Sequence, residues 1–446
     1  MTKNSSSRRN FIKLTATGAL GTALGWDAAS YARIPGSNDR IGVGIVGFSE
    51  RATDALLPAF NAISSAQNCE ITAVSDIWNL HRDEGAAFIN KLTGKSIAKA
   101  RNNDELYGMK NVQAVIISTA DHQHALHGVE AVRAGRDAYI EKPLANQMAD
   151  AHAILKAVKE TNRVVQIGTQ RRSAQNTLRA KAFLETGEFG DITMVEICTN
   201  ANQPLRWRRP ALVASLRAED TDWKRFVMQR TKDAFDAHKY IEFRLYWPYS
   251  SGILDQWMVH QIDMLQFITG LARPRSVVAQ GGIYSWRDGR TNPDTLTAVF
   301  DYGPLNDSTK GFQAIYSSRM NNSAGGNRDL YYSINGTLNV TTGKLTPDGG
   351  LTERYAKKVA KPTTLKERML LSEGRDNQAT EADTEADSTV VAHMRNWIDC
   401  VRNRKSPIAG IEAGYNHSVA LCMTIAALHS GKRARFDDTK QEVTLG

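Results

Sequence analysis

Residues 41–52 read IGVGIVGFSERA, and this stretch decides the fold. Ile41 to Val46 form a short apolar run that stops at a glycine, which is typical of a buried strand ending in a tight turn. A helical stretch follows. Gly47 stands where a dinucleotide-binding turn needs its first glycine, and Ala52 is accepted at the third position, where the helix packs on the strand. Ser49 replaces the middle glycine, and its hydroxyl could donate to a phosphate instead.

Strand-like and helix-like stretches alternate after this turn. Residues 70–75 form a second apolar run that ends at Asp76, and residues 112–119 form a third. A further run, residues 138–140, leads into Glu141. The alternation predicts an α/β fold whose first half is a doubly wound parallel sheet. Ligands of such sheets bind at the carboxyl ends of the strands, where these polar residues stand.

Asp76 bears on the choice of nucleotide. A carboxylate at the end of the second strand can accept both ribose hydroxyls and would repel a 2′-phosphate. No arginine follows it immediately. The position therefore favours NAD over NADP, although an aspartate at a strand end could also serve only as a helix N-cap.

Glu141-Lys142-Pro143 ends the strand-like run at residues 138–140. Lys142 is expected at the carboxyl edge of the sheet, and the proline makes the following turn rigid. An amine held in that place is a candidate acid or base. A lysine before a proline could equally belong to an ordinary surface turn, so the interpretation depends on the surrounding sheet.

Three histidines follow the third strand-like run, at His122, His124 and His127. A His-x-His pair can bind a metal, but this segment opens a helix and contains no cluster of carboxylates or cysteines. We therefore expect no metal site. His124 is instead expected beside a bound nicotinamide, and Thr119 at the cofactor.

The composition is that of a soluble protein of 446 residues, long enough for two domains. Residues 1–32 hold four basic residues and one acidic residue, a net charge of +3 that leaves +6 for the rest. No stripe of Lys and Arg interleaved with aromatic residues occurs, so nucleic acid is not an expected partner. The four cysteines are far apart and form no CxxC pair.

The first residues have the order of an export signal. SRRNFIK at residues 7–13 precedes a weakly apolar run, Leu14 to Leu24, and small residues up to Ala32. The pattern resembles a twin-arginine signal, with a basic tail as the alternative interpretation. We expect a periplasmic or otherwise exported protein. No later apolar run reaches membrane-spanning length, so no membrane span is expected.

These motifs resemble, in order and spacing, those of the glucose-fructose oxidoreductase / inositol dehydrogenase / MocA family. The resemblance continues through QIGTQRRS at residues 166–173, residues 252–263 and residues 393–399. It implies an N-terminal Rossmann domain and a C-terminal α/β domain with a large, mostly antiparallel sheet that often mediates dimers or tetramers. It also implies oxidation or reduction of sugars or cyclitols with NAD(P), the lysine of Glu-Lys-Pro lying near the nicotinamide.

On this resemblance the chain divides into four parts, and a polar stretch at residues 357–388 is expected to be a loop or arm. The parts are a signal peptide at 1–32, an NAD(P)-binding Rossmann domain at 40–165, a substrate and oligomerisation domain at 166–390, and C-terminal helices at 391–446 that pack back on the first domain.

The catalytic carboxylate departs from the family pattern. Dehydrogenase members have an aspartate four residues before the active-site histidine; if that histidine is His260, Gln256 takes this place and Asp255 precedes it. A helix turns about 100° per residue, so Asp255 would leave the face of His260, whereas Asp263 at i+3 would remain on it. We therefore expect either a dyad of His260 with Asp263, or His260 with Lys142 and no carboxylate.

The remaining expected site residues bind cofactor or substrate. We expect Glu141 and Gln170 at the cofactor and Arg172 at the substrate. Tyr246, Trp247 and Tyr249 suit stacking on a sugar, and a core or interface cluster is the alternative interpretation.

The expected function is hydride transfer at a ring carbon of a sugar, glycoside or cyclitol, with Lys142 taking the hydroxyl proton. Because NAD is scarce outside the cytoplasm, an exported enzyme should hold its cofactor tightly and regenerate it in place. One alternative is a glycosidase that oxidises C3 transiently, eliminates the aglycone and reduces the ketone again. A second alternative is a non-catalytic sugar-binding protein on the same fold.

Overall fold

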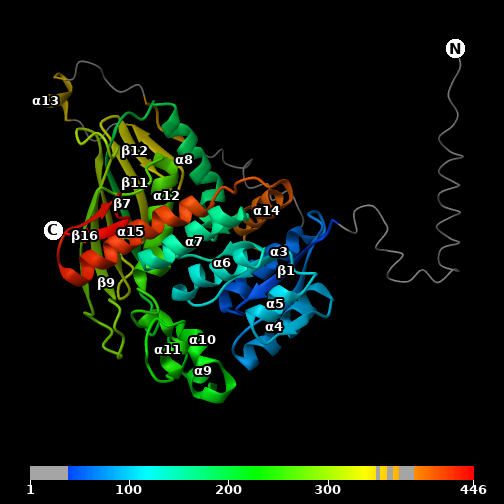
Figure 1. Ribbon diagram of the computed structural model, residues 1–446. Coiled ribbons are helices and arrows are strands. Elements are labelled where there is room, and N and C mark those ends of the chain that lie inside the picture. The colour runs from blue at the N-terminus through cyan, green and yellow to red at the C-terminus, as the bar shows by residue number, and fades with distance from the viewer. Residues whose placement is uncertain (1–38, 348–351, 359–364, 371–385) are drawn as a thin grey trace, which may run out of the picture.

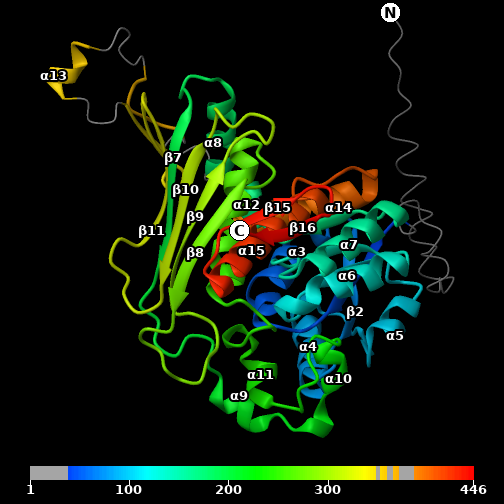
Figure 2. The same ribbon diagram turned by 60° about the vertical axis from the view of Figure 1, so that its left-hand side comes forward.

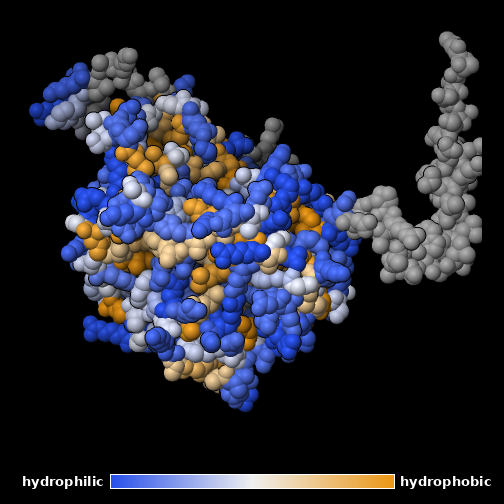
Figure 3. Space-filling model, in the orientation of Figure 1, coloured by the Kyte–Doolittle hydropathy of each residue, from blue (hydrophilic) through white to orange (hydrophobic). Residues whose placement is uncertain are grey.

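The computed structural model contains two sheets with helices between and around them (Figure 1). The expected signal at 1–32 and parts of the polar stretch at 357–388 lie outside the described residues. No helix in the described part is long and apolar enough to cross a membrane. One face of the molecule is mainly hydrophilic, with scattered apolar patches (Figure 3). The structure describes residues 39–347, 352–358, 365–370 and 386–446.

The first sheet has six parallel strands in the order β3-β2-β1-β4-β5-β6. This is the Rossmann order, with its switch point between β1 and β4, so the predicted doubly wound sheet is confirmed. The edge strand β3 was not predicted, because its sequence, Ala-Lys-Ala, carries no strand pattern. The strands are β1 (Ile41–Val46), β2 (Cys69–Ser75), β3 (Ala98–Ala100), β4 (Ala114–Ile117), β5 (Asp137–Ile140) and β6 (Val165–Ile167).

Helices cover both faces of this sheet, which is why its central strands are apolar at every position. Alternate side chains point to opposite faces. Ile45 and Tyr139 pack with α3 and α14, whereas Val115 and Ile140 pack with α6 and α7. The helices are α3 (Leu57–Ser64), α4 (Asn79–Thr93), α5 (Asn103–Gly108), α6 (His124–Arg133), α7 (Met148–Thr161) and α14 (Ser388–Asn403).

The second sheet has ten strands, and every neighbouring pair is antiparallel except β7 with β10. The expected large, mostly antiparallel sheet is therefore confirmed. Helices α8 (Gln175–Glu185), α12 (Val259–Thr269) and α15 (Ile411–Ser430) lie between it and the first sheet (Figures 1 and 2). Its strands are β7 (Ile192–Asn200), β8 (Ser276–Gly282), β9 (Thr295–Tyr302), β10 (Phe312–Arg319), β11 (Asn327–Ser333), β12 (Gly336–Asn339), β13 (Lys344–Pro347), β14 (Arg368–Met369), β15 (Ala434–Asp437) and β16 (Glu442–Leu445).

The end of the chain differs from the expected helical segment. α14 and α15 are helices, but β15 and β16 extend the second sheet beyond β8. Their polar residues, such as Arg435 and Glu442, conceal the strand pattern because an edge strand is solvated.

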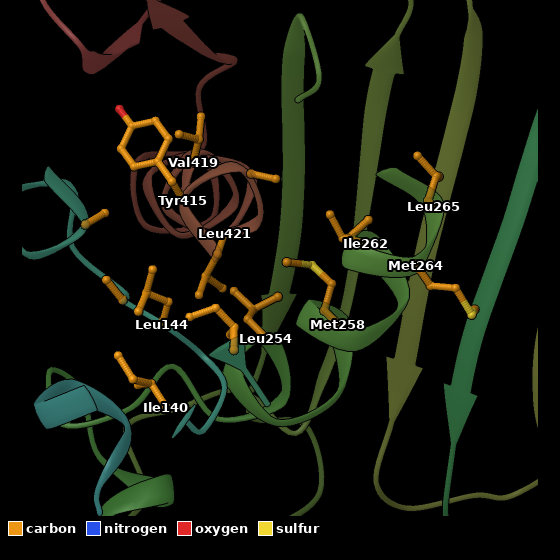
Figure 4. Packing of buried hydrophobic residues seen from close by; sticks show 14 of the residues in the cluster. Ile140, Leu144, Leu254, Met258, Ile262, Met264, Leu265, Tyr415, Val419 and Leu421 are labelled. Atoms are coloured by element: carbon orange, nitrogen blue, oxygen red, sulfur yellow. The ribbon is translucent and has the colours of Figure 1, made fainter. Parts of the chain in front are cut away.

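Helix α15 joins the two halves of the core (Figure 4). Its Val419 and Leu421 belong to one apolar cluster with Leu144 of the first domain and Met258 beside the second sheet. Gly414 permits the close approach, since a Cβ there would lie 2.7 Å from side-chain atoms of both Ile167 and Leu144. The two sheets are therefore packed as one body through this helix.

A buried charge cluster reinforces the same junction. Arg172, from the short turn η3 (Gln170–Ser173), donates to both oxygens of Asp263 on α12 at 2.7 and 2.9 Å. His417 of α15 completes the cluster: Leu144 N donates to its Nε2, so its Nδ1 carries the proton and donates to Asp263 at 3.3 Å. Burial raises the pKa of Asp263, but the charge of Arg172 and these hydrogen bonds outweigh it and lower the pKa to about 2.

We expect Asp263→Asn to lower the free energy of unfolding by about 3–5 kcal/mol, because it leaves the Arg172 charge buried without its partner. The pKa of Asp263 is lower in the folded chain than in the unfolded one. The stabilisation is therefore complete above about pH 4 and fades as the pH falls toward the folded value. Thermal or urea unfolding at several pH values measures both effects. Glu160→Gln, in the exposed pair with Lys156, should change stability by less than about 0.5 kcal/mol; equal losses in the two variants would contradict the interpretation.

Candidate active site

A cavity of about 330 Å³ lies at the carboxyl edge of the first sheet. One wall consists of the ends of β1, β2 and β4, with Gly47, Ser49, Asp76 and Thr119. The other wall comes from residues 205–249, called the cap segment here, which run between β7 and α12. From the cap segment, Trp207, Arg209, Leu212, Phe226, Tyr240, Ile241, Phe243 and Arg244 line the cavity.

The turn after β1 has the shape that the motif predicts. Gly47 has φ +84°, and a Cβ there would lie 2.6 Å from Thr119 Cγ2, so only glycine fits. Ser49 shares a hydrogen bond of 2.6 Å with Ser118 at the end of β4. It also accepts from the backbone N–H of Ala52 at 3.3 Å, and so caps the helical turn that follows. Thr119 Oγ1 is buried and has no hydrogen-bond partner among the described residues, which leaves it available to a ligand.

Asp76 is buried at the end of β2 and lines the same cavity. Its two oxygens accept the backbone N–H groups of Phe48 and Trp78, each at 2.8 Å. Each carboxylate oxygen keeps a free lone pair, the arrangement needed for a ribose diol. Burial raises the pKa of Asp76, against the two backbone hydrogen bonds and the nearby His81, which lower it.

The cap segment is tied to the first domain around the cavity. Arg209 forms a two-pronged ion pair with Glu50, both bonds 2.8 Å long, directly beside the Gly47 turn. Further ion pairs join Arg225 to Glu130 and Arg230 to Asp150. An apolar cluster seals the contact: Trp78 and Ala120 of the first domain pack against Leu216, Phe226, Val227, Tyr240, Phe243 and Tyr249 of the cap segment. The cap segment contains α9 (Pro210–Ser215), α10 (Trp223–Val227) and α11 (Ala237–Ile241).

Lys142 stands where the sequence predicted, directly after β5 and before Pro143. Its half-buried Nζ donates to the backbone oxygens of Asp255 and Gln256 at 3.3 and 3.0 Å, and to the side-chain oxygen of Gln256 at 3.4 Å. Burial lowers the pKa of Lys142 to about 8, partly opposed by the charges of Asp121 and Glu141. A large fraction of the amine is therefore neutral slightly above neutral pH.

The residues that contact Lys142 belong to a π-helical turn, η6 (Leu254–Met258), which leads into α12. A π-turn hydrogen-bonds residues five apart, here the backbone N–H of Val259 with the backbone oxygen of Leu254. The expected rotation of 100° per residue is that of an α-helix and does not apply within this turn. Asp255 is fully buried, accepting from Ser251 N at 2.7 Å and Asn146 Nδ2 at 3.2 Å. Burial, and then the charge of Asp121, raise its pKa.

His260 forms no hydrogen bond with Asp263 among the described residues. Its Nδ1 is buried without a partner among the described residues. Burial, and then the positive charge of Lys142, hold the pKa of His260 well below its ordinary value, so the ring is neutral. The expected dyad of His260 with Asp263 needs correction, because the Asp263 carboxylate is taken up by Arg172 and His417. For the same reason Arg172 is ion-paired and buried instead of lying at a substrate.

Five expected cofactor residues do not line the cavity, namely Ala52 and Lys142, already described, and His124, Glu141 and Gln170. His124 is placed between two backbone oxygens, Pro143 O at 2.8 Å and Thr119 O at 3.2 Å, and so ties the Lys142 turn to the end of β4. Glu141 binds Arg51 Nε at 3.0 Å. Gln170 has a buried side-chain oxygen without a partner in the described part of the chain.

The expected sugar-stacking aromatics are also absent from the cavity wall. Tyr249 is fully buried and shares a hydrogen bond with Thr231, and the ring of Trp247 packs against His429. Tyr246 bonds Arg208 through its hydroxyl. A different pair was missed: Trp207 lines the cavity and contacts Trp257 of η6, with ring centres 5.9 Å apart.

The histidines considered as metal ligands have other partners. His122 Nε2 lies 2.8 Å from the backbone oxygen of Phe226, and His127 Nδ1 lies 3.0 Å from Asn103 Nδ2. Within the residues that the structure describes, no group of three or more His, Cys, Asp or Glu side chains is arranged to hold a metal ion.

The Rossmann strand order and the cavity at the carboxyl edge of the sheet are those of a dinucleotide-binding domain. Residues 41–169 match the model of the GFO_IDH_MocA oxidoreductase family, NAD-binding Rossmann fold. The match covers the first domain, and the family assignment applies to residues 41–169.

Curated relatives include two inositol 2-dehydrogenases. The protein from Gluconacetobacter diazotrophicus is 30% identical over 156 residues, 35% of this chain and 44% of the relative. The protein from Salmonella typhimurium is 26% identical over 232 residues, 51% of this chain and 64% of the relative. The matches thus span between about two fifths and two thirds of these relatives.

Solved structures share the fold over most of the chain. The WlbA dehydrogenase of Bordetella pertussis, in complex with NADH and UDP-GlcNAcA, has a TM-score of 0.63 at 16% identity and covers 89% of this chain and 99% of its own. A levoglucosan dehydrogenase in complex with NADH and levoglucosan has a TM-score of 0.60, also at 16% identity, and covers the same shares.

Replacing Gly47 by alanine should weaken NAD binding by about tenfold or more, because the Cβ enters the cleft against Thr119 and the left-handed backbone adds strain. The NAD content per purified chain, read by absorbance and mass spectrometry, measures this. Gly94→Ala is the matched control: its φ of +71° gives similar strain, but no atom lies within 4 Å of the new Cβ. Loss of NAD from both variants would point to general destabilisation instead.

Proposed function

We propose that this protein oxidises or reduces a hydroxyl group of a sugar, glycoside or cyclitol by hydride transfer, using a tightly held NAD. The observation that carries the proposal is the Lys142 amine, whose pKa is about 8, held by the π-turn η6 next to a nucleotide-type cleft. Inositol 2-dehydrogenases among the relatives and the levoglucosan complex among the structural neighbours support the substrate class.

The residues of the cleft fit the pyrophosphate and one ribose of NAD. Gly47, Ser49 and Thr119 would hold the pyrophosphate, since all three line the cleft and the Thr119 hydroxyl has no other partner among the described residues. Asp76 would accept the ribose hydroxyls, and its negative charge supports NAD over NADP. When bound, NAD supplies the carbon that accepts or gives up the hydride.

Lys142 is assigned as the base in the direction of oxidation. It must be neutral to take the hydroxyl proton, so one of its three contacts has to be released. The contact to the side-chain oxygen of Gln256 is the longest of the three, at 3.4 Å, and is assigned as the one that the lysine gives up when it loses its proton, while the amide itself stays in place. His260, neutral and with an open Nδ1, is assigned to hold the substrate hydroxyl beside the lysine.

In this proposal the cap segment holds NAD tightly in the cleft. Leaving the cleft would require the Arg209–Glu50 ion pair and the apolar cluster around Phe226 to open together. We also propose export through the twin-arginine pathway with NAD already bound. The second sheet turns its outer face away from the helices of this chain (Figure 2), and this supports a homo-dimer or tetramer.

A second candidate is the redox-assisted glycosidase. It needs an acid for the departing aglycone besides the base at the oxidised carbon. Asp255 supports this candidate, because burial raises its pKa and so favours the protonated form, and its backbone oxygen contacts the Lys142 amine at 3.3 Å.

The protein purified from cells should contain close to one NAD per chain and keep it through dialysis. Mass spectrometry of the denatured protein and its supernatant measures the amount. A preparation that binds NAD reversibly and weakly would contradict retention of the cofactor while leaving hydride transfer possible.

Lys142→Ala should lower the rate of substrate oxidation by about 10²- to 10⁴-fold, because general-base catalysis is lost. In the wild type, kcat should rise with pH through about 8, since the lysine acts when it has lost its proton. The assay follows oxidation of inositols and sugars, and p-nitrophenol release from aryl glycosides tests the second candidate. Lys156→Ala, an exposed lysine on α7, is the control. An unchanged rate in Lys142→Ala would remove the lysine from the mechanism.

A further inference from the structure

Gln256 connects two charged regions at the reacting end of the cleft. It lies on the π-turn η6, and its Nε2 donates to Asp121 Oδ2 at 2.6 Å. Its Oε1 accepts from two cations, the Lys142 amine at 3.4 Å and Arg244 Nε at 3.1 Å. One amide therefore spans a carboxylate on one side and two positive groups on the other.

The charges decide which way this amide points. In the reverse orientation, the amide oxygen would face the Asp121 carboxylate and the NH₂ group would face two donors, so every contact would be repulsive. Asp121 thereby determines that an oxygen, and not an NH₂ group, is presented to Lys142 and Arg244.

Asp121 is well placed for such a role. It lies shortly after the end of β4, next to Ala120. Its side chain is buried, with the residue 3% exposed, and accepts a hydrogen bond from Ser250 Oγ at 2.6 Å. It forms no ion pair with a lysine or arginine among the described residues. The positive charges nearest to it along this connection are those of Lys142 and Arg244, on the other side of the Gln256 amide. Its side chain does not cap the short helix η2 (Asp121–Gln123) that it begins.

We propose that Asp121 is a positioning residue for the reaction, which fixes the amide of Gln256 so that its oxygen holds the Lys142 amine and the Arg244 guanidinium at the substrate. This inference rests on the proposed role of Lys142 as the base. Asp121 acts through Gln256 and need not touch the substrate itself. Asp121 thus supplies the negative charge that the expected His260–Asp263 dyad would have brought to the site.

The charges around Lys142 set the direction of the effect. From the neighbouring elements, Asp121, Glu141 and Asp255 are acidic, Arg51 and Arg244 are positive, and His260 is neutral. Burial lowers the pKa of Lys142, and the negative charge of Asp121 is the strongest influence that raises it. Removing its charge should therefore lower the pKa of Lys142 further.

Asp121→Asn should move the titration of Lys142 down by about one pH unit. It should also reduce kcat by about 10²-fold, because the amide of Gln256 loses its fixed orientation. Gln256→Met keeps the charge of Asp121 and removes only the hydrogen bonds of the Gln256 amide. The kcat should therefore fall, while the pKa of Lys142 moves less than in Asp121→Asn. Asp191→Asn, an exposed carboxylate before β7, is the matched control and should change neither quantity.

Lys142 is titrated directly on the full-length protein, without substrate, by competitive acetic anhydride labelling at a series of pH values. Peptide mass spectrometry reads the labelling rate of Lys142 against exposed lysines. The pH profile of kcat is recorded in parallel.

The expected downward shift in Asp121→Asn, with the smaller shift in Gln256→Met, supports the inference. A Lys142 titration identical in Asp121→Asn and wild type would overturn it. If Asp121→Asn does not fold, Gln256→Met decides, because an unchanged kcat there removes the connection from the reaction. If the labelling shifts but Lys142→Ala remains fully active, the proposed function fails while the coupling between Asp121 and Lys142 stands.

Discussion

The hydrogen bonds from the Lys142 amine to the backbone oxygens of Asp255 and Gln256 are the interaction on which the site depends. Lys142 follows β5 of the first sheet, and the two oxygens belong to η6, which leads into α12 beside the second sheet. These bonds therefore fix the distance between the domains where reaction would occur. Packing of α15 against both halves keeps that distance constant. The buried Arg172–Asp263–His417 cluster has the same effect at the opposite side of α12.

The π-turn η6 arranges the polar groups around Lys142. Its wider turn leaves the backbone oxygens of Asp255 and Gln256 able to accept from the lysine. It also frees the next position, Gln256, to bind Asp121. The turn thereby adds a polar connection to the site just before α12, whose residues pack in the core.

The sequence predicted those features that depend on where a strand ends. Gly47, Asp76 and Lys142 follow β1, β2 and β5, and a strand end determines the edge at which the next side chain stands. The pairing of Asp263 with Arg172 could not be predicted, because it joins residues 91 positions apart through tertiary packing. The sugar-stacking residues were misplaced for a related reason. Several aromatic residues at 240–249 belong to the apolar cluster between the cap segment and the first domain. Trp207, in contrast, lies far from them in the sequence.

The position of α15 in the chain has a consequence for biosynthesis. This helix occupies residues 411–430 of 446, yet it supplies the surface on which both domains close. Neither half of the shared core can be completed until α15 has left the ribosome, because domains fold as their parts become available. The Gly47 turn, made more than 360 residues before α15, therefore waits until that helix is synthesised for the packing that fixes the cleft around it.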